Sequence, residues 1–284
     1  MMTSATGGIT DATMPKSPAP PPTEEKRPAR VYSAPALEKA IDIIELLSTE
    51  PAGLTITEVA TRLSRSISEL FRIMVVLDRR GWLRKDPASD RYRATYKLLE
   101  TAHRATPAQE LTHIAAPLMR RLSEVAMQSC HLVVVNGDRG LILLRQESPG
   151  PAGFAVRVGT GIELLDSCSG HVLLAFMVEH NRAVLLDRLV PAKARAAIDT
   201  MLGKVRADGF QRVDSTRMAG VTDISWPIFG YDGQIVAALT IPFLEVLDQT
   251  PHLSETEAID ALRETTARIS DGLGWSERGG TDRP

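Results

Sequence analysis

The chain has 284 residues, of which 43% are hydrophobic and 24% are charged, so it has the composition of a globular protein with room for about two domains. Its formal net charge of −2 excludes nucleic-acid binding through overall positive charge, and such binding would need a local basic patch. The two cysteines, Cys130 and Cys168, are not spaced as Cys-x-x-Cys, which argues against a disulfide scaffold or a structural zinc site.

The first predicted elements are a tail and two short helices. Residues 1–32 are proline-rich and polar, which predicts a disordered tail. Pro35 suits the first turn of a helix, whose predicted apolar face consists of Leu37, Ala40, Ile41, Ile44 and Leu47. Thr55 and Glu58 then form a capping box that begins a second helix.

A third, amphipathic helix is predicted to start at Ser66. Ser66 and Glu69 make another capping box, and Gly81 ends the helix. One face of the helix is apolar and carries Leu70, Ile73, Met74 and Leu77. The opposite face carries Arg65, Ser68, Arg72, Val75 and Arg79.

A basic hairpin is predicted directly after this helix. Residues 82–84 and 91–93 flank the turn-forming stretch 86–90 and should pair as strands. Two helices, a short turn, a third helix and a hairpin make a winged helix-turn-helix domain, which we place at 33–94 with the third helix as the DNA reader. The alternative is that the arginines of the third helix simply face solvent.

The second half of the chain predicts a linker helix at 95–106 and an α+β domain at 107–275, followed by a short disordered tail at 276–284. Pro117 should kink or split the first helix of this domain. The predicted strands cover 132–136, 141–146, 154–158, 212–216, 222–229 and 235–243. The predicted helices cover 169–178, 193–208 and a last helix that Ser254 and Glu257 cap.

Several of these segments resemble the IclR family of transcriptional regulators. They read ALEKAIDIIELLS, LTITEVATRLSRS, FRIMVVLDRRGWLRKD and RYRATYKLLE in the first half, and LLDSCSGHVLLAF, DGFQRVDSTRMAGVTDISWPIF and GQIVAALTIP in the second. The resemblance implies a DNA-binding winged domain, a GAF/PAS-like effector-binding domain, and a homodimer to which the first domain and the linker contribute. Two departures lie on the third helix, where Ile67-Ser68-Glu69 replaces the family's usual Lys-Ser-Thr and Phe71 replaces its usual His.

We predict that the start of the third helix contacts bases and that the hairpin contacts phosphates. The N-terminal part of a reader helix meets base edges in the major groove, which assigns Arg65, Ser66, Ser68, Glu69 and Arg72. The capping box is the alternative use of Glu69. The hairpin residues assigned to phosphates are Arg84, Lys85, Arg91 and Arg93.

The predicted effector site lies at the start of the helix that follows Asp166. A helix N-terminus offers backbone N–H groups and partial positive charge to a carboxylate, and the resemblance implies an effector here. The predicted site residues are Ser167, Cys168, Ser169, Gly170, Asp214, Asp223 and Thr240. Because Asp223 stands where many relatives have Cys, we expect a polar or hydroxylated effector. The alternatives are helix capping by the serines and a structural role for Asp223.

An enzyme is the main alternative class. Cys168 and His171 stand three residues apart, at a spacing that allows a thiolate–imidazole pair in a small-molecule-processing enzyme with a vestigial winged domain. Free cysteines are more often small buried residues, and no metal, phosphate-loop or nucleophile motif is present. We therefore predict no catalytic residue, no metal and no cofactor. A winged domain used for protein contact is a second alternative.

Taken together, these patterns predict a ligand-responsive DNA-binding regulator of α+β class. Its expected partners are double-stranded promoter DNA with a palindromic operator, a small metabolite such as an organic acid, and further copies of the chain in a dimer or tetramer. Repressor and activator both stay open. No apolar run approaches the ~20 residues that span a membrane, so we expect no membrane partner and a reducing cytoplasm.

Overall fold

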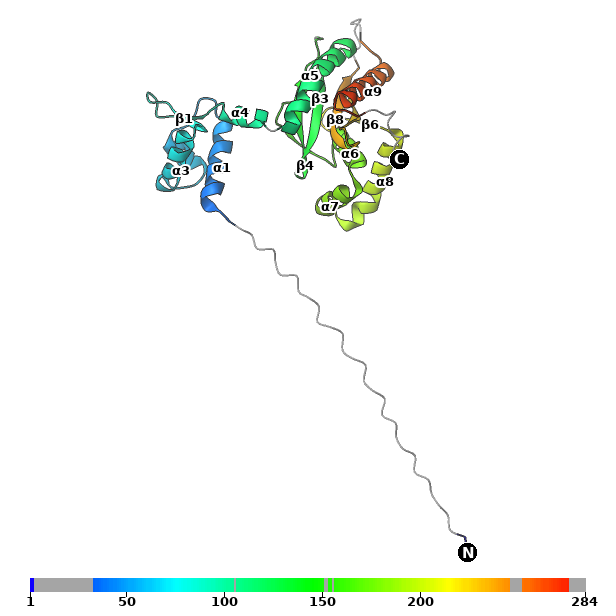
Figure 1. Cartoon of the computed structure of the whole chain (residues 1–284), viewed down its shortest axis with the longest axis horizontal. Helices are drawn as coiled ribbons and strands as arrows, with labels where there is room; N and C mark the ends of the chain where they lie inside the picture. Colours follow the sequence, from blue (N-terminus) through cyan, green and yellow to red (C-terminus); the bar gives the residue numbers. More distant parts are fainter. Residues whose placement is uncertain (3–32, 105, 151–152, 155, 246–251, 276–284) are drawn as a thin grey trace. The chain divides into compact units, whose positions relative to one another are not determined.

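The computed structural model describes residues 1–2, 33–104, 106–150, 153–154, 156–245 and 252–275. The disordered tails predicted at 1–32 and 276–284 fall, apart from residues 1 and 2, outside this part of the chain. The chain divides into two compact units between Tyr96 and Lys97, which are coloured blue to cyan and green to red in Figure 1.

The first unit consists of three helices and a two-stranded wing. Its elements are α1 (Pro35–Ser48), α2 (Ile56–Arg62), α3 (Ile67–Arg79), β1 (Leu83–Lys85) and β2 (Tyr92–Ala94). Both predicted capping boxes are present, at Thr55 before α2 and at Ser66 before α3. Gly81 has a φ of 77°, the left-handed conformation that ends a helix, as predicted.

The wing is fixed to the helices by backbone and core contacts. β1 and β2 pair antiparallel, with Arg84 opposite Arg93. The backbone N–H of Tyr92 donates to the Leu54 carbonyl at 2.8 Å, so the α1–α2 loop joins the wing as a short bridge. Leu83 and Tyr92 are buried in the same core as Leu70 of α3. The hairpin therefore has a defined position beside α3.

The apolar face predicted for α1 is only partly correct. Leu47 is buried as predicted, and so is Ile43, which the predicted face does not include, whereas Leu37 and Ile41 are 60% and 46% exposed. The apolar residues of α1 occupy a wider arc of the helix than α3 and β2, which pack against it, can cover.

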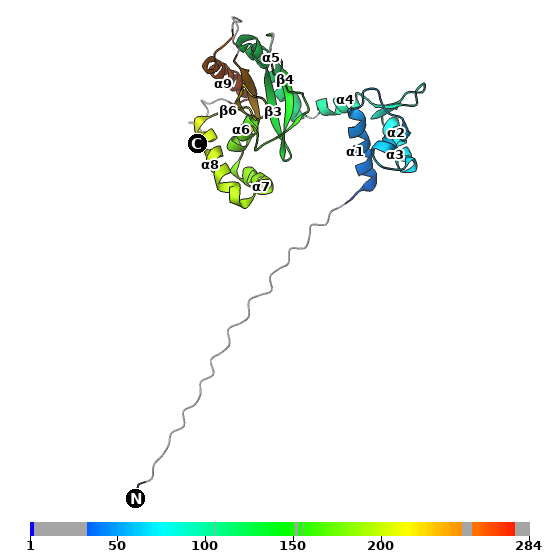
Figure 2. The same ribbon diagram turned by 180° about the vertical axis from the view of Figure 1, so that it is seen from behind.

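The second unit is a six-stranded antiparallel sheet with helices on both faces, which confirms the predicted α+β class (Figures 1 and 2). In spatial order the strands are β5 (Gly161–Glu163), β4 (Arg139–Gln146), β3 (Cys130–Asn136), β8 (Ile235–Leu244), β7 (Val221–Phe229) and β6 (Gln211–Asp214). One face packs against α5 (Thr106–Ala126) and α9 (Glu255–Gly272). The other packs against α6 (Cys168–Phe176), and α7 (Glu179–Leu189) and α8 (Arg195–Asp208) share the core on that side. The helix α4 (Lys97–Arg104) precedes α5, and a short 3-10 turn, η1 (Ala192–Ala194), precedes α8.

The strand predicted at 154–158 is wrong, because the described residues of that stretch form no strand and the edge strand is β5. The backbone that pairs with Ile142 comes from later in the chain. The Gly159 N–H donates to the Ile142 carbonyl at 2.8 Å, and the Ile142 N–H donates to the Thr160 carbonyl at 3.0 Å. Val156 packs on the core without joining the sheet.

Two further helices differ from the prediction. The sequence pattern misses α7, because this helix has no side-chain N-cap and buries only Leu185 and Leu186. Pro117 does not split α5, whose assigned helix is continuous. Ala115 and Met119, on either side of Pro117, are fully buried and hold both halves of the helix on the sheet.

Candidate functional site

The N-terminal turn of α3 is attached to α1 by a charged pair. The Glu69 N–H donates to Ser66 Oγ at 3.3 Å, and the Ser66 N–H donates back to the Glu69 carboxylate at 3.0 Å. Lys39 Nζ of α1 lies 2.9 Å from the same carboxylate. The Lys39 hydrogen bond, followed by those from Ser66, lowers the pKa of Glu69 to about 2. Ser66 and Glu69, both predicted to contact DNA, are thus engaged in holding α3.

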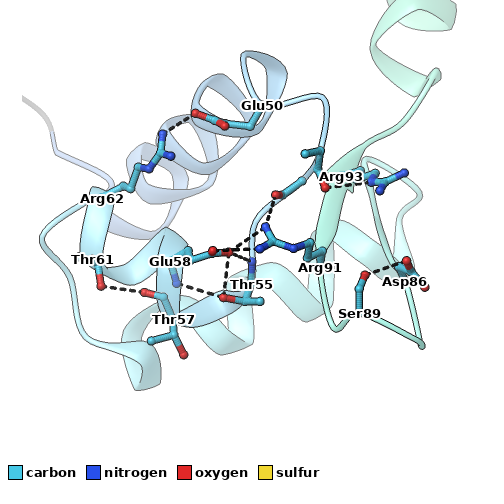
Figure 3. Close-up of polar contacts among 12 residues, drawn as sticks. Glu50, Thr55, Thr57, Glu58, Thr61, Arg62, Asp86, Ser89, Arg91 and Arg93 are labelled. Atoms are coloured by element: carbon cyan, nitrogen blue, oxygen red, sulfur yellow. Dashed lines mark hydrogen bonds and ion pairs between the residues drawn. The ribbon is translucent and has the colours of Figure 1, made fainter.

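The wing also uses part of its charge internally, as Figure 3 shows for Arg91. Arg91 donates to both carboxylate oxygens of Glu58, at 3.0 and 3.1 Å, and to the Gly53 carbonyl at 2.7 Å. Lys85 Nζ lies 2.7 Å from Asp90, and Arg93 Nε donates to the Ala52 carbonyl at 3.3 Å. Of the four wing residues predicted to contact phosphates, Arg84 alone makes no ion pair or side-chain hydrogen bond within the described residues.

The outward side of α3 keeps its arginines exposed. We call this side, together with Arg65 just before the helix, the reader surface. It consists of Arg65, Ser68, Phe71, Arg72, Val75 and Arg79. In the part of the chain that the structure describes, Arg65, Arg72 and Arg79 make no ion pair, so their positive charge faces solvent. The core side of the helix holds Leu70, Met74 and Leu77. The reader surface therefore presents exposed positive charge that a polyanion can contact.

In the second unit, the start of α6 is tightly packed against the preceding loop. Ser167 Oγ accepts a hydrogen bond from the Gly170 N–H at 3.2 Å and donates to the Glu163 carbonyl at 2.7 Å. A Cβ on Gly170 would lie 2.2 Å from the Leu164 carbonyl oxygen, so only glycine fits. Ser169 is buried. Ser167 therefore caps α6, which is the alternative to the predicted effector contact.

A row of buried polar side chains crosses the sheet beneath α6. His131 of β3 pairs in register with Thr240 of β8, which pairs with Ser225 of β7. Thr240 Oγ1 donates a hydrogen bond to Ser225 Oγ at 2.9 Å. Burial, with a smaller contribution from the charge of Arg217, lowers the pKa of His131 to about 4. The sequence pattern singled out Thr240 but missed His131, Ser225 and Arg217.

Asp223 lies next to this row and Asp214 does not. Burial raises the pKa of Asp223, while a hydrogen bond from Ser215 and the charge of Arg217 act in the opposite direction. Asp214 is exposed and lines a separate hollow of about 600 Å³ together with Glu255. Val213 pairs with Asp223 and Asp214 with Thr222, so alternation along β6 turns Asp214 away from Asp223.

Cys168 and His171 do not form a thiolate–imidazole pair. Cys168 Sγ lies 3.3 and 3.2 Å from the carbonyl oxygens of Gln211 and Asp223. Burial and then the Asp223 carboxylate raise the pKa of this thiol well above its ordinary value. His171 Nε2 is 2.7 Å from the Leu165 carbonyl, and its Nδ1 is 3.2 Å from Gln211 Nε2. Both side chains are bound elsewhere, which does not suit nucleophilic catalysis.

A hollow of the second unit lies at the opposite end of α6. It has a volume of about 1000 Å³, is mostly apolar, and is open to solvent. Leu173, Val184 and Val236 contribute apolar surface, and polar or charged residues such as His180 and Arg188 also line it. None of the predicted effector residues lines it. We call it the α6–α7 groove.

Within the described residues, no group of three or more His, Cys, Asp or Glu side chains is placed to hold a metal ion. No helix in that part of the chain is long and apolar enough to cross a bilayer.

Two family models match the chain, one on each unit. Residues 103–271 match the model of the bacterial transcriptional regulator IclR C-terminal domain, and residues 36–87 match the IclR helix-turn-helix domain. The first model alone spans more than half of the 284 residues.

Characterised proteins and solved structures agree with these matches. The chain is 29% identical to the regulator BhcR of Paracoccus denitrificans, over 86% of this chain and 90% of that protein. It is 25% identical to KdgR of Escherichia coli, over 89% and 97% of the two chains. The crystal structure of Thermotoga maritima IclR superposes with a TM-score of 0.61 at 25% identity, over 84% and 98%. An IclR homologue of Microbacterium hydrocarbonoxydans, complexed with 4-hydroxybenzoate, has the same fold, with a TM-score of 0.70 at 22% identity over 84% and 98%.

Proposed function

The chain belongs to the IclR family of bacterial transcriptional regulators, and from this premise we propose that it reads a two-fold symmetric operator through α3. The observation that supports this most is the reader surface, where Arg72 and Arg79 are exposed on the outward side of a helix whose other side is core, and Arg65 is exposed just before that helix. Arg65 directly precedes the helix and Arg72 lies in its first half, the part that meets base edges in the major groove.

This proposal assigns fewer residues of the wing to phosphate contacts than the sequence suggests. Arg84 has its guanidinium available, and Lys85 and Arg93 are exposed although each has one internal partner. Arg91 is half-buried between Glu58 and the Gly53 carbonyl, so we assign it to holding the wing in place. Ser66 and Glu69 are assigned to fixing the end of α3, leaving Arg65, Ser68 and Arg72 for the bases.

We further propose that the regulator acts as a homodimer or a homotetramer in the cytoplasm, where its promoter lies. One reader helix covers one half-site, and a symmetric operator requires two. Exposed apolar side chains on each unit support contacts with another copy: Leu37 and Ile41 on α1 of the first unit, and Leu99, which is 55% exposed, on α4 of the second.

Selection from a pool of random duplexes tests the DNA-binding proposal. The purified full-length protein is expected to enrich one sequence with two inverted half-sites. Its affinity for that duplex should fall steeply with salt, since phosphate contacts release counterions. Repeated selection that enriches no sequence, with and without the metabolites below, would contradict the proposal.

The effector site we propose lies beneath α6, at the row of His131, Thr240 and Ser225 with Asp223 and Arg217 beside it. Arg217 supplies a positive charge for a carboxylate, and Asp223 can accept a hydrogen bond from a ligand hydroxyl. This pairing of one cation with one carboxylate favours a small hydroxylated acid over a purely apolar acid. The α6–α7 groove is the competing location.

Thermal shifts with a panel of acids, hydroxy acids and neutral alcohols distinguish the two locations. A ligand that binds the native state raises its melting temperature by mass action. We expect hydroxy acids to stabilise the wild type and Val184→Asp, which alters the α6–α7 groove, but not Arg217→Gln. The reverse pattern would place the effector in the groove.

A further inference from the structure

The reader surface carries two large apolar side chains among its arginines. Phe71 and Val75 are 53% and 45% exposed, and they stand four residues apart, so they are neighbours on the helix surface. Arg72 and Ser68 adjoin them on the same outward side. A single exposed Phe is common on protein surfaces, but a contiguous apolar strip on the reader surface indicates a site where another molecule binds.

The neighbouring elements of the first unit do not cover this strip. The helices α1 and α2 and the strand β1 pack against α3, and the residues they bury are Leu70, Met74 and Leu77. Phe71 lies nearly above Asp78, seven residues on, and the Asp78 carboxylate accepts a hydrogen bond from the Lys85 N–H of β1 at 3.1 Å. Phe71 is therefore on the side of the reader surface nearest the wing.

The charges around the strip identify the kind of partner. Arg65, Arg72 and Arg79 make no ion pair among the described residues, and Arg84 of the wing likewise has no charged partner there. A surface that combines these cations with an apolar strip suits a polyanion that also presents apolar groups. The major groove of DNA does so, because thymine displays its C5-methyl group between the phosphate-lined edges.

We propose that Phe71, extended by Val75, contacts thymine C5-methyl groups and makes this regulator select thymine at those operator positions. The inference rests on the proposed DNA-binding function and adds to it which base is read and by which side chain. Arginine contacts alone would favour guanine, so the apolar strip gives this chain an additional specificity.

The test replaces thymine by uracil, which removes the methyl group and keeps the hydrogen-bonding edge. The duplex enriched by selection is amplified once with dTTP and once with dUTP, and the full-length protein is titrated against both. From the transfer free energy of one methyl group we expect about a fourfold loss of affinity per contacted thymine, and on the order of tenfold for two.

Variants separate methyl contact from any change that uracil makes to the duplex. Phe71→Ala should bind both duplexes with nearly equal affinity, and Val75→Ala should reduce the preference. Phe71→Leu keeps an apolar side chain and should retain much of it. Arg72→Ala should weaken binding to both duplexes by similar factors, so that their ratio stays near the wild-type value. Phe71 and Val75 are exposed, so these substitutions leave the core intact.

Three results would overturn the inference. Equal binding of both duplexes by the wild type would reject methyl contact while leaving specific DNA binding established. A preference for thymine that survives in Phe71→Ala and Val75→Ala would assign it to duplex shape. A Phe71→Ala protein with unchanged DNA binding but altered molecular mass would assign the strip to protein contact. Failure to enrich any duplex would instead reject the proposed function itself.

Discussion

The buried polar residues beneath α6 owe their behaviour to position rather than to residue type. Cys168 and His131 would ordinarily be reactive or titratable near neutral pH, yet burial disfavours the thiolate of one and the imidazolium of the other. Cys168→Ser is compatible with regulation in this account, because the thiol lies near two carbonyl oxygens and carries no chemistry.

His131 gives a testable dependence of stability on pH. Its folded-state pKa of about 4 lies below the ordinary 6.5, so the unfolded state binds more protons between these values. The stabilisation is complete above the unfolded pKa and is lost as pH falls toward the folded pKa. When the pH is lowered from ~7 to ~4.5, we expect the free energy of unfolding of the wild type to fall by about 2 to 3 kcal/mol more than that of His131→Gln. Urea unfolding at the two pH values measures this difference, and equal losses would contradict burial of a neutral imidazole.

Two helical glycines form a matched pair of substitutions. Ala at Gly170 would bring a Cβ to 2.2 Å from the Leu164 carbonyl oxygen, whereas Ala at Gly203 of α8 meets nothing within 4 Å. We expect Gly170→Ala to lower the free energy of unfolding by about 1 to 3 kcal/mol or more, because the added methyl group overpacks the site. Gly203→Ala should gain about 0.5 to 1 kcal/mol by reducing backbone entropy in the unfolded chain. Thermal unfolding of both variants measures these changes in stability. If Gly170→Ala were as stable as the wild type, α6 would be able to move away from the loop.

At the scale of elements, local signals in the sequence predict the first unit well. Capping boxes at Thr55 and Ser66 and the glycine at 81 act through neighbouring residues, so they locate α2 and α3 closely. The role of Arg91 depends on Glu58, which is far away in sequence, and composition alone assigns that arginine to phosphate.

The second unit shows the same division between local and distant information. The predicted strands at 222–229 and 235–243 correspond closely to β7 and β8. The edge strand β5 depends on which backbone reaches Ile142, and α7 has neither a cap nor a clear apolar stripe. Likewise, the row of His131, Thr240 and Ser225 exists only once β3, β8 and β7 are in register.

The wing provides a prediction at this scale. Removing Arg91 breaks the contacts with Glu58 and the Gly53 carbonyl, whereas removing Arg84 breaks no described side-chain contact. Arg91→Ala should therefore lower the melting temperature of the first unit more than Arg84→Ala. Arg84→Ala should weaken DNA binding with little change in stability. Circular dichroism melts and DNA titrations of the same two proteins measure both effects, and equal melting temperatures would contradict a structural role for Arg91.

At the scale of the whole molecule, regulation through the proposed oligomer requires that the effector distinguish two of its arrangements. A ligand that binds both arrangements equally shifts nothing, however tight its binding. Two reader helices held at one spacing match two half-sites, and a change of spacing costs affinity at both. A ligand with 100-fold preference for one arrangement would supply about 2.7 kcal/mol of coupling, enough to change operator occupancy.

The central claim is that the reader surface recognises DNA, and one comparison tests it most directly. Affinities of the wild type, Arg72→Ala and Arg268→Ala are measured on the selected duplex and on a scrambled duplex across a range of salt concentrations. Arg268 is an exposed arginine of α9, so its loss changes net charge equally without touching α3. We predict that Arg72→Ala weakens binding to the selected duplex roughly 10- to 100-fold and narrows its preference over the scrambled one, while Arg268→Ala stays within about twofold of wild type. Equal effects of the two substitutions would contradict the account.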